Sequence, residues 1–399
     1  NEFRLKLKNF KPIRPTEVSR GEVMENVQEG DKVDLFAFPT PRWHESDGGR
    51  YLGTGCSVIT KDFEEGWTNL GPYRVQVHTR DTAGLFVSHY HHGSIMMRKY
   101  WAEGKSCPVA VAIGVEPRVF LAGCMSMAWG VSDYDFAGWM NNAPVEVLKG
   151  HYSGLDLPAH SEIVLEGEVP PPEQESQVEG PFGEFHGYYG GEASLQPVIK
   201  VRKVMFRNDP IIEGTPPIRP PFGSPSIPIT NAPTTWNKLE AMGIAGIKGV
   251  YTIKAGGGPQ ITVISIKQLY AGHSKQVGLA TSSALSHLCR FIVVVDDDID
   301  PTNTGEVLWA IATRCEPADS IDLLRGFAST SLDPRLPPEV KAKGSFTNTR
   351  AIIYAVKPFE WYAQFPQVNK ANDELRQKIS KKWSDLFSKP EFSRVPRDS

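Results

Sequence analysis

Residues 291–300 read FIVVVDDDID, an apolar run that ends in a group of acidic residues. Five apolar and mostly β-branched residues in a row predict a strand. Residues 274–288 before it have helical spacing, and the runs 250–254 and 261–267 flank three glycines and predict a hairpin. Strand, helix and strand at this spacing predict a compact α/β domain.

The acidic run 296–300 resembles a metal site at first sight. Acidic residues that follow a strand more often cap a helix or form a solvated turn, and Pro301 favours that interpretation. We therefore expect a turn here rather than a metal centre.

Other segments lie on either side of this predicted α/β domain. Residues 216–228 (PPIRPPFGSPSIP) suit a domain junction. A helix is expected from Asn231 to Met242, with Gly243 as its stop. Residues 372–388 predict a terminal amphipathic helix that packs on its own chain or on another subunit. Its apolar residues are Leu375, Ile379, Trp383 and Leu386.

The first two hundred residues consist mainly of predicted strands. The runs 54–60, 73–79 and 162–166 have strand composition, and residues 94–102 predict a helix. Many strands with few helices predict a barrel-like β core. We therefore expect a multi-domain α+β fold with a split-β-barrel-like domain at 1–215, a junction and linker helix at 216–244, an α/β domain at 245–335 and an extension with oligomer contacts at 336–399.

The composition excludes several classes of protein. The chain has 399 residues, enough for two or three domains, and its 43 basic and 46 acidic residues argue against a nucleic-acid or membrane-surface binder. No apolar run approaches the roughly 20 residues that a membrane span needs. Five scattered cysteines exclude a disulfide framework and a structural zinc site and favour a reducing cytoplasm.

Residues 178–188 (VEGPFGEFHGY) place Glu179 and Glu184 on either side of a turn rich in glycine and proline. Such a turn could bring both carboxylates to one cavity, where one donates a proton and the other orients it. The alternative is a solvated loop with two surface glutamates, which is more common for this spacing alone.

Two further segments carry candidate binding groups. Residues 66–78 present Asn69 and Arg74, and an arginine at the edge of a strand suits a carboxylate, although a surface salt bridge is the commoner case. Residues 88–93 (SHYHHG) cluster three histidines, and a hard divalent ion there would also need oxygen ligands such as Asn69 and Asp133. Dinucleotide, Walker, serine-hydrolase and zinc-protease motifs are missing from the sequence.

Taken together, these segments resemble the UbiD family of decarboxylases, which use prenylated flavin mononucleotide. The resemblance rests on collinear blocks, of which EGPFGE is the most specific. The blocks are 44–49 (HESDGG), 67–69 (WTN) with Arg74, 131–134 (VSDY), 161–167 (SEIVLEG), 179–188 (EGPFGEFHGY), and 296–300 (DDDID) with Trp309 and Arg314.

The resemblance implies the catalytic residues position by position. Arg74, Glu179 and Glu184 match the family's Arg–Glu–Glu network. In that network Glu184 is the acid that protonates the carbon left after CO2 departs, and Arg74 and Glu179 set its position and protonation.

The resemblance also implies a divalent metal, manganese first, that bridges the cofactor phosphate. Asn69 and His91 match two of its ligands. The third family ligand is a glutamate, whereas this sequence has the shorter Asp133. A potassium ion is a further candidate, and residues 282–288 lack the lysine with which some members hold the phosphate.

The matching positions define two larger sets of residues. The cofactor-binding set is Asn69, Leu70, Tyr73, Arg74, Tyr90, His91, Met125 and Ser126. The substrate-pocket set is Leu85, Val87, Tyr90, Phe185 and Phe327. Apolar and aromatic walls suit a planar ring.

The implied activity is a non-oxidative, reversible decarboxylation of an aromatic or heteroaromatic acid through a covalent adduct with prenylated FMN. An α,β-unsaturated acid of the cinnamate kind, work in the carboxylating direction, and a non-catalytic assembly subunit stay open as alternatives. The retained Arg74, Glu179 and Glu184 argue against an inert subunit.

The resemblance further implies a flavin prenyltransferase as cofactor supplier and a homo-oligomer, either a dimer or a hexamer. We expect a cytoplasmic enzyme without nucleic-acid or membrane partners. Family chains carry an additional N-terminal α/β segment, and we expect it to be missing from this sequence.

Overall fold

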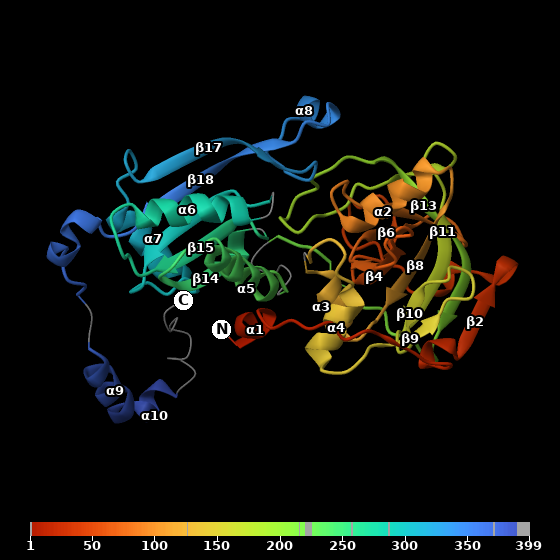
Figure 1. Cartoon of the computed structure of the whole chain (residues 1–399), viewed down its shortest axis with the longest axis horizontal. Helices are drawn as coiled ribbons and strands as arrows, with labels where there is room; N and C mark the ends of the chain where they lie inside the picture. The colour runs from red at the N-terminus through yellow and green to blue at the C-terminus, as the bar shows by residue number, and fades with distance from the viewer. Residues whose placement is uncertain are drawn as a thin grey trace. The chain divides into compact units, whose positions relative to one another are not determined.

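The computed structural model consists of two compact units, each made from two stretches of the chain (Figure 1). The first unit comprises Asn1–Ser226 and Ser331–Gly344, and the second comprises Ile227–Thr330 and Ser345–Ser399. The residues that the structure describes are 2–125, 127–214, 216–219, 226–256, 258–285, 288–369 and 372–388.

A curled antiparallel sheet of ten strands forms the centre of the first unit within the described residues (Figure 1). Its main path runs β3-β6-β7-β13-β11-β8-β4-β5, and β2 and β12 pair with β13. The strands are β2 (Asn26–Glu29), β3 (Arg50–Tyr51), β4 (Cys56–Lys61), β5 (Thr68–Gly71), β6 (Arg74–Val77), β7 (Thr82–Phe86), β8 (Cys107–Ile113), β11 (Ile163–Val169), β12 (Ser176–Glu179) and β13 (Ser194–Phe206). A small second sheet contains β1 (Thr16–Glu17), β9 (Glu146–Lys149) and β10 (Asp156–Pro158).

The central strands of this sheet are buried on both faces because alternate side chains enter two different cores. Val58 and Val111 join one core together with Val75 of β6. The next residue on β4, Ile59, joins the other core, to which α4 contributes Phe136. The helices of this unit are α1 (Glu2–Leu7), α2 (His92–Ala102), α3 (Pro117–Gly123), α4 (Asp133–Asn141) and α8 (Pro338–Ala342).

The second unit is built on a five-stranded sheet in the order β14-β15-β16-β18-β17. The three inner strands run parallel, and the two edge strands run antiparallel to their neighbours. The bounds are β14 (Ile247–Thr252), β15 (Ile261–Ile266), β16 (Phe291–Asp296), β17 (Ile321–Ala328) and β18 (Thr347–Ala355).

Strand β16 is the apolar run FIVVV, and it lies at the middle of this sheet. Ile292 packs in a core with Val277 of α6, whereas Val293 packs on the opposite face with Val307 of α7. The helices are α5 (Ser226–Ala241), α6 (His273–Ala284), α7 (Thr304–Arg314), α9 (Asp373–Lys382) and α10 (Ser384–Phe387). Short 3-10 helices are η1 (Glu22–Met24), η2 (Gly30–Lys32), η3 (Leu35–Ala37), η4 (Lys254–Gly256) and η5 (Phe359–Gln364).

The predicted fold class is confirmed: the chain is a multi-domain α+β protein with a curled β sheet followed by an α/β unit. The predicted hairpin is β14 with β15. The exact predicted segment boundaries stay predictions, and residues 331–344 group with the first unit by their contacts.

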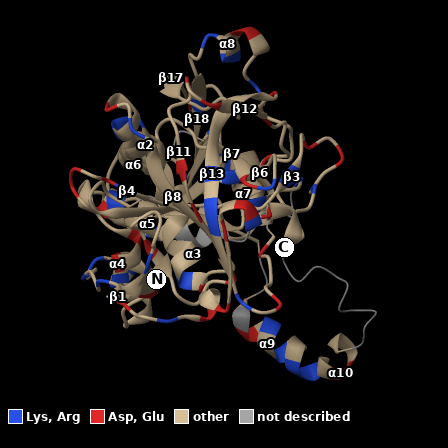
Figure 2. Ribbon diagram, turned by 90° about the vertical axis from the view of Figure 1, so that its right-hand side faces the viewer, with Lys and Arg blue, Asp and Glu red and all other residues tan. Residues whose placement is uncertain are grey.

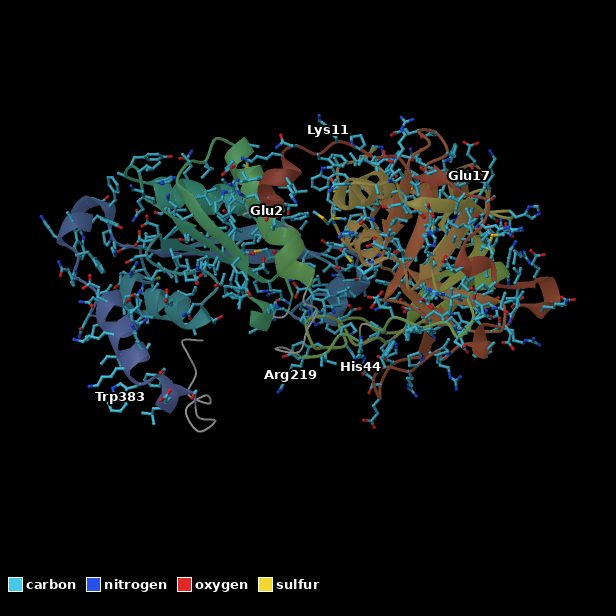
Figure 3. The ribbon with its side chains drawn as sticks, turned by 90° about the horizontal axis from the view of Figure 1, so that it is seen from below. Glu2, Lys11, Glu17, His44, Arg219 and Trp383 are labelled. Carbon is cyan, nitrogen blue, oxygen red and sulfur yellow. The ribbon has the colours of Figure 1, made fainter. Side chains whose placement is uncertain are left out.

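The predicted terminal helix consists of two shorter helices, α9 and α10, which meet at Trp383 (Figure 3). Leu375, Ile379 and Trp383 are exposed, and lysines and arginines are frequent on α9 (Figure 2). In the described part of the chain, no helix is both long and apolar enough to span a membrane.

Candidate active site

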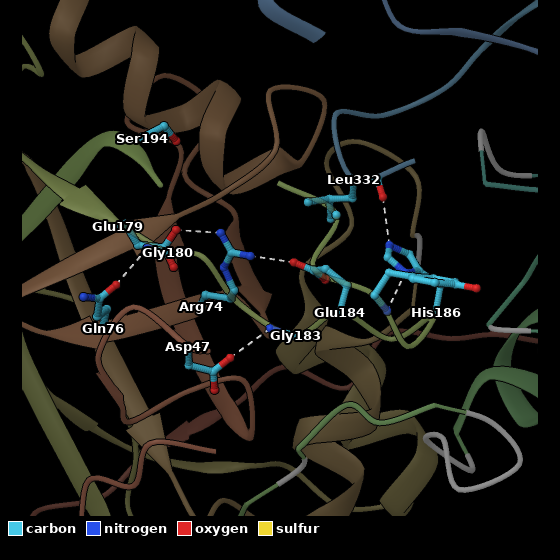
Figure 4. A network of polar contacts seen from close by, with 12 residues as sticks. Asp47, Arg74, Gln76, Glu179, Gly180, Gly183, Glu184, His186, Ser194 and Leu332 are labelled. Atoms are coloured by element: carbon cyan, nitrogen blue, oxygen red, sulfur yellow. Dashed lines mark hydrogen bonds and ion pairs between the residues drawn. The ribbon is translucent and has the colours of Figure 1, made fainter. Parts of the chain in front are cut away.

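Arg74, Glu179 and Glu184 are brought together in the first unit, as the sequence predicts (Figure 4). Arg74 Nη1 donates to Glu184 Oε1 at 2.5 Å, and Nη2 donates to Glu179 Oε2 at 2.6 Å. Glu179 is only 1% exposed and Glu184 only 6%. These three residues, the catalytic trio below, are therefore a buried cluster with one cation and two acids.

Strand alternation explains why Arg74 faces this cluster. On β6, Val75 and Val77 enter the apolar core, so Arg74 and Gln76 point to the opposite face. Glu179 arrives as the last residue of β12. Because Val75 is held in the apolar core, the side chain of Arg74, the residue before it, must point to the opposite face of the strand.

The loop after Glu179 is held by its backbone against the segment that precedes β3. Gly183 N donates to Asp47 Oδ1 at 3.0 Å, and Gly48 N donates to the carbonyl of Pro181 at 2.7 Å. A Cβ on Gly48 would lie 1.8 Å from the carbonyl oxygen of Gly180, so only glycine permits this approach. Asp47 also accepts from the backbone N of His44, which Figure 3 labels.

The loop continues past Glu184 into a second set of anchors. His186 Nδ1 accepts the backbone N–H of Tyr188 at 3.2 Å, and its Nε2 lies 2.8 Å from the carbonyl of Leu332, to which it donates (Figure 4). Lys341 donates to the carbonyl of Gly190. Segment Ser331–Gly344 thus fixes the backbone that follows Glu184.

Burial governs the protonation of the two glutamates. It raises the pKa of Glu179 and of Glu184, while Arg74 works against it in both cases. The charge of Glu179 raises the pKa of Glu184 further. One arginine cannot balance two ionised carboxylates, so the trio favours a state that holds one proton.

Aromatic rings enclose the guanidinium. The ring of Phe86 lies 3.9 Å from Arg74 Cζ, and that of Phe182 lies 5.2 Å away. Arg74 Nε is buried without a hydrogen-bond partner in the structure. This N–H is therefore left to donate to an acceptor atom of a bound group.

The three predicted metal ligands gather around Tyr73. Asn69 Nδ2 lies 3.4 Å from Tyr73 Oη, and the ring of His91 lies 5.6 Å from that of Tyr73. Asp133 Oδ2 accepts the backbone N–H of Leu70, the neighbour of Asn69, at 2.7 Å. The structure therefore places the three predicted ligands in one region of the first unit.

The chemistry of these donors suits a hard divalent cation. An amide, a carboxylate and one imidazole favour manganese or magnesium over zinc. Burial raises the pKa of Asp133, which a bound cation would oppose. Among the described residues, no group of three His, Cys, Asp or Glu side chains could hold a metal, so a site here depends on Asn69.

The remaining predicted cofactor residues differ in their surroundings. Leu70 and Met125 are buried in the core shared with α3 and α4, whereas Tyr90 is exposed with its ring against that of His91. Helix α2 follows His91, which gives it no side-chain cap, so its first N–H groups suit a phosphate. Ser126 lies outside the described residues.

The predicted pocket residues are not all on the face of Arg74. Leu85 pairs with Val75 and packs in the apolar core, and Val87 packs against the same core. Phe185 is half-buried beside the ring of His186. Phe327 belongs to β17 of the second unit, where its ring faces Arg350, so its place in a pocket stays a prediction.

Sequence reasoning assigned no role to several residues that either contact the trio or hold the strands and the loop around it. They are Asp47, Tyr51, Gln76, Phe86, Phe182 and His186. Asp47, Phe182 and His186 lie within the quoted blocks 44–49 and 179–188, and Gln76 lies two residues after Arg74 on a predicted strand and so shares its face. Two cavities, one of about 420 Å³ beside Trp139 and one of about 290 Å³ beside Trp361, are lined by residues outside the trio.

Comparison with known proteins places this fold in the carboxy-lyase class of enzymes. Two family models match the chain: the 3-octaprenyl-4-hydroxybenzoate carboxy-lyase Rift-related domain over residues 15–220, and the C-terminal domain of the same enzyme over residues 227–355. The chain therefore belongs to the UbiD family of carboxy-lyases.

Several named relatives of the chain are decarboxylases. The chain is 33% identical to phenolic acid decarboxylase of Bacillus subtilis, over 82% of this chain and 69% of the relative. It is 31% identical to pyrrole-2-carboxylic acid decarboxylase of Pseudomonas aeruginosa, over 94% and 77%. The UbiD-class enzyme HmfF of Pelotomaculum thermopropionicum, solved with FMN, superposes with a TM-score of 0.83 at 26% identity, over 94% and 81%. An evolved dimeric form of HmfF has been solved with prFMN, with a TM-score of 0.79 at 25% identity over 94% and 80%.

Proposed function

We propose that this chain catalyses the non-oxidative, reversible decarboxylation of an aromatic or heteroaromatic carboxylic acid with prenylated FMN. The observation that carries the proposal is the pair of buried glutamates on one arginine. A buried carboxyl group that keeps a proton near neutral pH is what a general acid needs. The phenolic-acid and pyrrole-2-carboxylic-acid decarboxylases among the relatives support the substrate class.

Within the trio, Glu184 is the proton donor and Glu179 is its partner. Both pKa values are raised by burial, but Glu179 accepts hydrogen bonds from Arg74 and Tyr51, whereas Glu184 accepts from Arg74 alone among the described side chains. Donors favour the ionised form, so Glu179 carries the charge and Glu184 the proton. After CO2 leaves, Glu184 gives this proton to the substrate carbon.

The cofactor supplies what side chains cannot. When bound, prenylated FMN offers an electrophilic ring that takes up the electron pair left by CO2. Asn69, His91 and Asp133 would hold a divalent metal, manganese first, at its phosphate, and Arg74 would approach it through its free Nε. The chain contributes orientation, exclusion of water and one proton.

The context of the enzyme is part of the proposal. A flavin prenyltransferase supplies the cofactor, and the enzyme works in the cytoplasm as a homo-oligomer. The exposed Leu375, Ile379 and Trp383 on α9 and at its end would pack against another subunit. A chain that ends at residue 371 and keeps its oligomeric state in light scattering would reject this helix as a contact.

Production of the protein together with a flavin prenyltransferase tests the function. The bound chromophore is identified by absorbance and mass, and CO2 release is then screened over benzoic, phenolic, pyrrole, furan and cinnamic acids. We expect release from at least one aromatic or heteroaromatic acid. A protein loaded with the modified flavin that releases CO2 only from cinnamic acids would reject the substrate class, and one that releases none would reject the function.

A further inference from the structure

The hydroxyl group of Tyr51 lies between two oxygen atoms that both accept hydrogen bonds. Tyr51 Oη is 3.2 Å from Glu179 Oε1 and 3.1 Å from Gln76 Oε1. Tyr51 and Gln76 face each other across the β3–β6 pair, and the tyrosine is 0% exposed. Strand register therefore fixes a buried hydroxyl beside the carboxylate of Glu179.

The orientation of Gln76 leaves the hydroxyl with a choice of acceptor. Gln76 Oε1 accepts the backbone N–H of Gly180 at 2.9 Å, so the oxygen, not the amide nitrogen, faces Tyr51. A hydroxyl group has a single proton to donate. It can serve Glu179 or Gln76 at any moment, but not both.

Each choice corresponds to one protonation state of Glu179. When Glu179 is ionised, Tyr51 donates to it. When Glu179 carries a proton on Oε1, that proton is donated to Tyr51 Oη, and Tyr51 donates in turn to Gln76. Every proton then lies between a donor and an acceptor in both states, which is what a buried group requires.

We propose that Tyr51 and Gln76 form a switchable proton seat that lets Glu179 hold a proton after Glu184 has given up its own. The inference rests on the proposed function, in which Glu184 is the donor. In this role Tyr51 and Gln76 are positioning residues, because they act through Glu179.

The charge balance of the trio follows from this seat. Before transfer, neutral Glu184, ionised Glu179 and cationic Arg74 sum to zero. Transfer forms a C–H bond in the product and leaves Glu184 ionised, so the buried trio becomes negative. Glu179 then takes a proton from solvent onto Oε1, the hydroxyl of Tyr51 turns to Gln76, and the sum returns to zero.

Several other titratable or charged groups also surround Glu179. Burial raises the pKa of Glu179, the charge and hydrogen bond of Arg74 and the hydrogen bond of Tyr51 lower it, and the charge of Asp47 raises it. Glu184 faces it across Arg74. His78 also lies near Glu179, because both approach Gly84. A Cβ on Gly84 would lie 2.5 Å from His78 Nε2 and 3.6 Å from Glu179 Cγ.

Two substitutions should move the titration of Glu179 in opposite directions. Tyr51→Phe keeps the ring against Phe182, 4.6 Å away, but removes the donor from the ionised carboxylate, so the pKa of Glu179 rises. Gln76→Met removes the second acceptor, so Tyr51 can only donate to Glu179 and the pKa falls. Each shift should be about one pH unit, or about tenfold in proton affinity.

The matched control is Tyr134→Phe. Tyr134 is as buried as Tyr51, but its hydroxyl donates to one acceptor, the carbonyl of Asp156 at 2.7 Å, in the other core. Its removal costs a comparable hydrogen bond without touching Glu179. We expect no shift of the glutamate titration in this variant.

The measurement is a carbon-13 NMR titration of the glutamate carboxyl groups in the full chain, with Glu179→Gln to assign the signal. Opposite shifts in Tyr51→Phe and Gln76→Met, with none in Tyr134→Phe, would support the seat. Shifts in the same direction, or no shift, would overturn it. This readout needs no substrate, so opposite shifts in a protein that decarboxylates no acid would keep the seat and reject the proposed function.

Turnover gives the second readout. In the loaded enzyme, Tyr51→Phe should move the proton from Glu184 towards Glu179, so kcat falls about tenfold while KM stays within about twofold. The alkaline limb of the kcat profile should move to higher pH, because the last proton of the pair is held more tightly. A lower kcat with an unmoved limb would show a merely structural role and overturn the proposal.

Discussion

Two buried arginines of the described chain each bind two acidic side chains, yet their surroundings differ. In the first unit, Arg74 gives one nitrogen to Glu179 and the other to Glu184. In the second unit, Arg314 grips Asp298 with both terminal nitrogens, at 2.8 and 3.0 Å, and also reaches Asp296 at 3.0 Å. The arginine contacts are similar in the two units. A difference between the two pairs of acids must therefore come from the other groups that bind them.

The second unit provides a second cation and two further donors, whereas among the described side chains the first unit adds only the hydroxyl of Tyr51, which donates to Glu179. Lys357 Nζ binds Asp298 at 2.7 Å, and the backbone N of Lys357 and the amide of Gln268 both donate to Asp296. Two cations thus face two acids. Burial raises the pKa of Asp298, but hydrogen bonds from Arg314 and Lys357 outweigh it and leave that pKa below its usual range.

The comparison separates a structural ion pair from a catalytic one. With two cations for two acids, the network around Arg314 holds the pKa of Asp298 below its usual range, although burial still raises the pKa of Asp296. The catalytic trio has one cation for two acids, and the pKa of each acid is raised. It can exchange a proton because it is electrostatically incomplete.

The largest expected effect is on the incomplete network. Glu184→Gln keeps the size of the side chain but supplies no proton, so CO2 release should fall about a hundred- to ten-thousand-fold. The measurement is CO2 release, with solvent hydrogen uptake into the product, in protein that carries the full modified flavin. Turnover within a few-fold of the unaltered enzyme would exclude Glu184 as the donor.

The sequence predicts the trio because its acids lie in one short motif, whereas the partners of the trio come from distant strands. Tyr51 reaches Glu179 only through the register of β3 on β6, and Asp47 reaches Gly183 only through a loop contact. Neither pairing follows from local spacing.

The same limit explains the acidic run after β16. The expected turn is correct for Asp300, which accepts from Thr302 N and Oγ1, but Asp296 is buried on Arg314 at the end of the next helix. An arginine that arrives from another element cannot be read from the strand. The break of the terminal helix at Trp383 likewise lies within a continuous helical pattern.

The next largest effect is on the free energy of unfolding, through the network of Arg314 with Asp296 and Asp298. Arg314→Met leaves Asp296 buried without its cation, so the free energy of unfolding should fall by about 3–5 kcal/mol in urea. Arg74→Met should cost less, because Glu184 already holds a proton and Glu179, whose pKa burial raises, can take one up when the cation is removed. An equal or larger loss for Arg74→Met would contradict the distinction between the two networks.

A smaller effect concerns the proposed metal. His91→Ala removes the one imidazole ligand, so retention of the flavin after gel filtration with manganese should weaken about ten- to a hundred-fold. His92→Ala is the control, since His92 packs against Trp67 and Trp129 and is not a proposed ligand. Unchanged flavin occupancy in His91→Ala would remove His91 from the site.

The smallest effect is a difference in pH slope between the two networks. The folded pKa of Glu184 lies above its unfolded value, so its burial costs stability as pH rises above about 4.3. Glu184→Gln lacks that cost and should gain relative stability with rising pH, by about 1.4 kcal/mol for each unit of pKa difference.

The folded pKa of Asp298 is depressed, so its contribution is present above about pH 3.9 and is lost as pH falls through the folded value. The deficit of Asp298→Asn should therefore shrink in acid, and, because Asp298 is partly exposed, its slope should be the shallower one. Urea unfolding of Glu184→Gln from about pH 4 to about pH 8, and of Asp298→Asn from about pH 2 to about pH 5, checks the signs. If the free energy of unfolding, relative to the unaltered protein, changed with pH in the same direction in both variants, the distinction between the networks of Arg74 and Arg314 would be wrong.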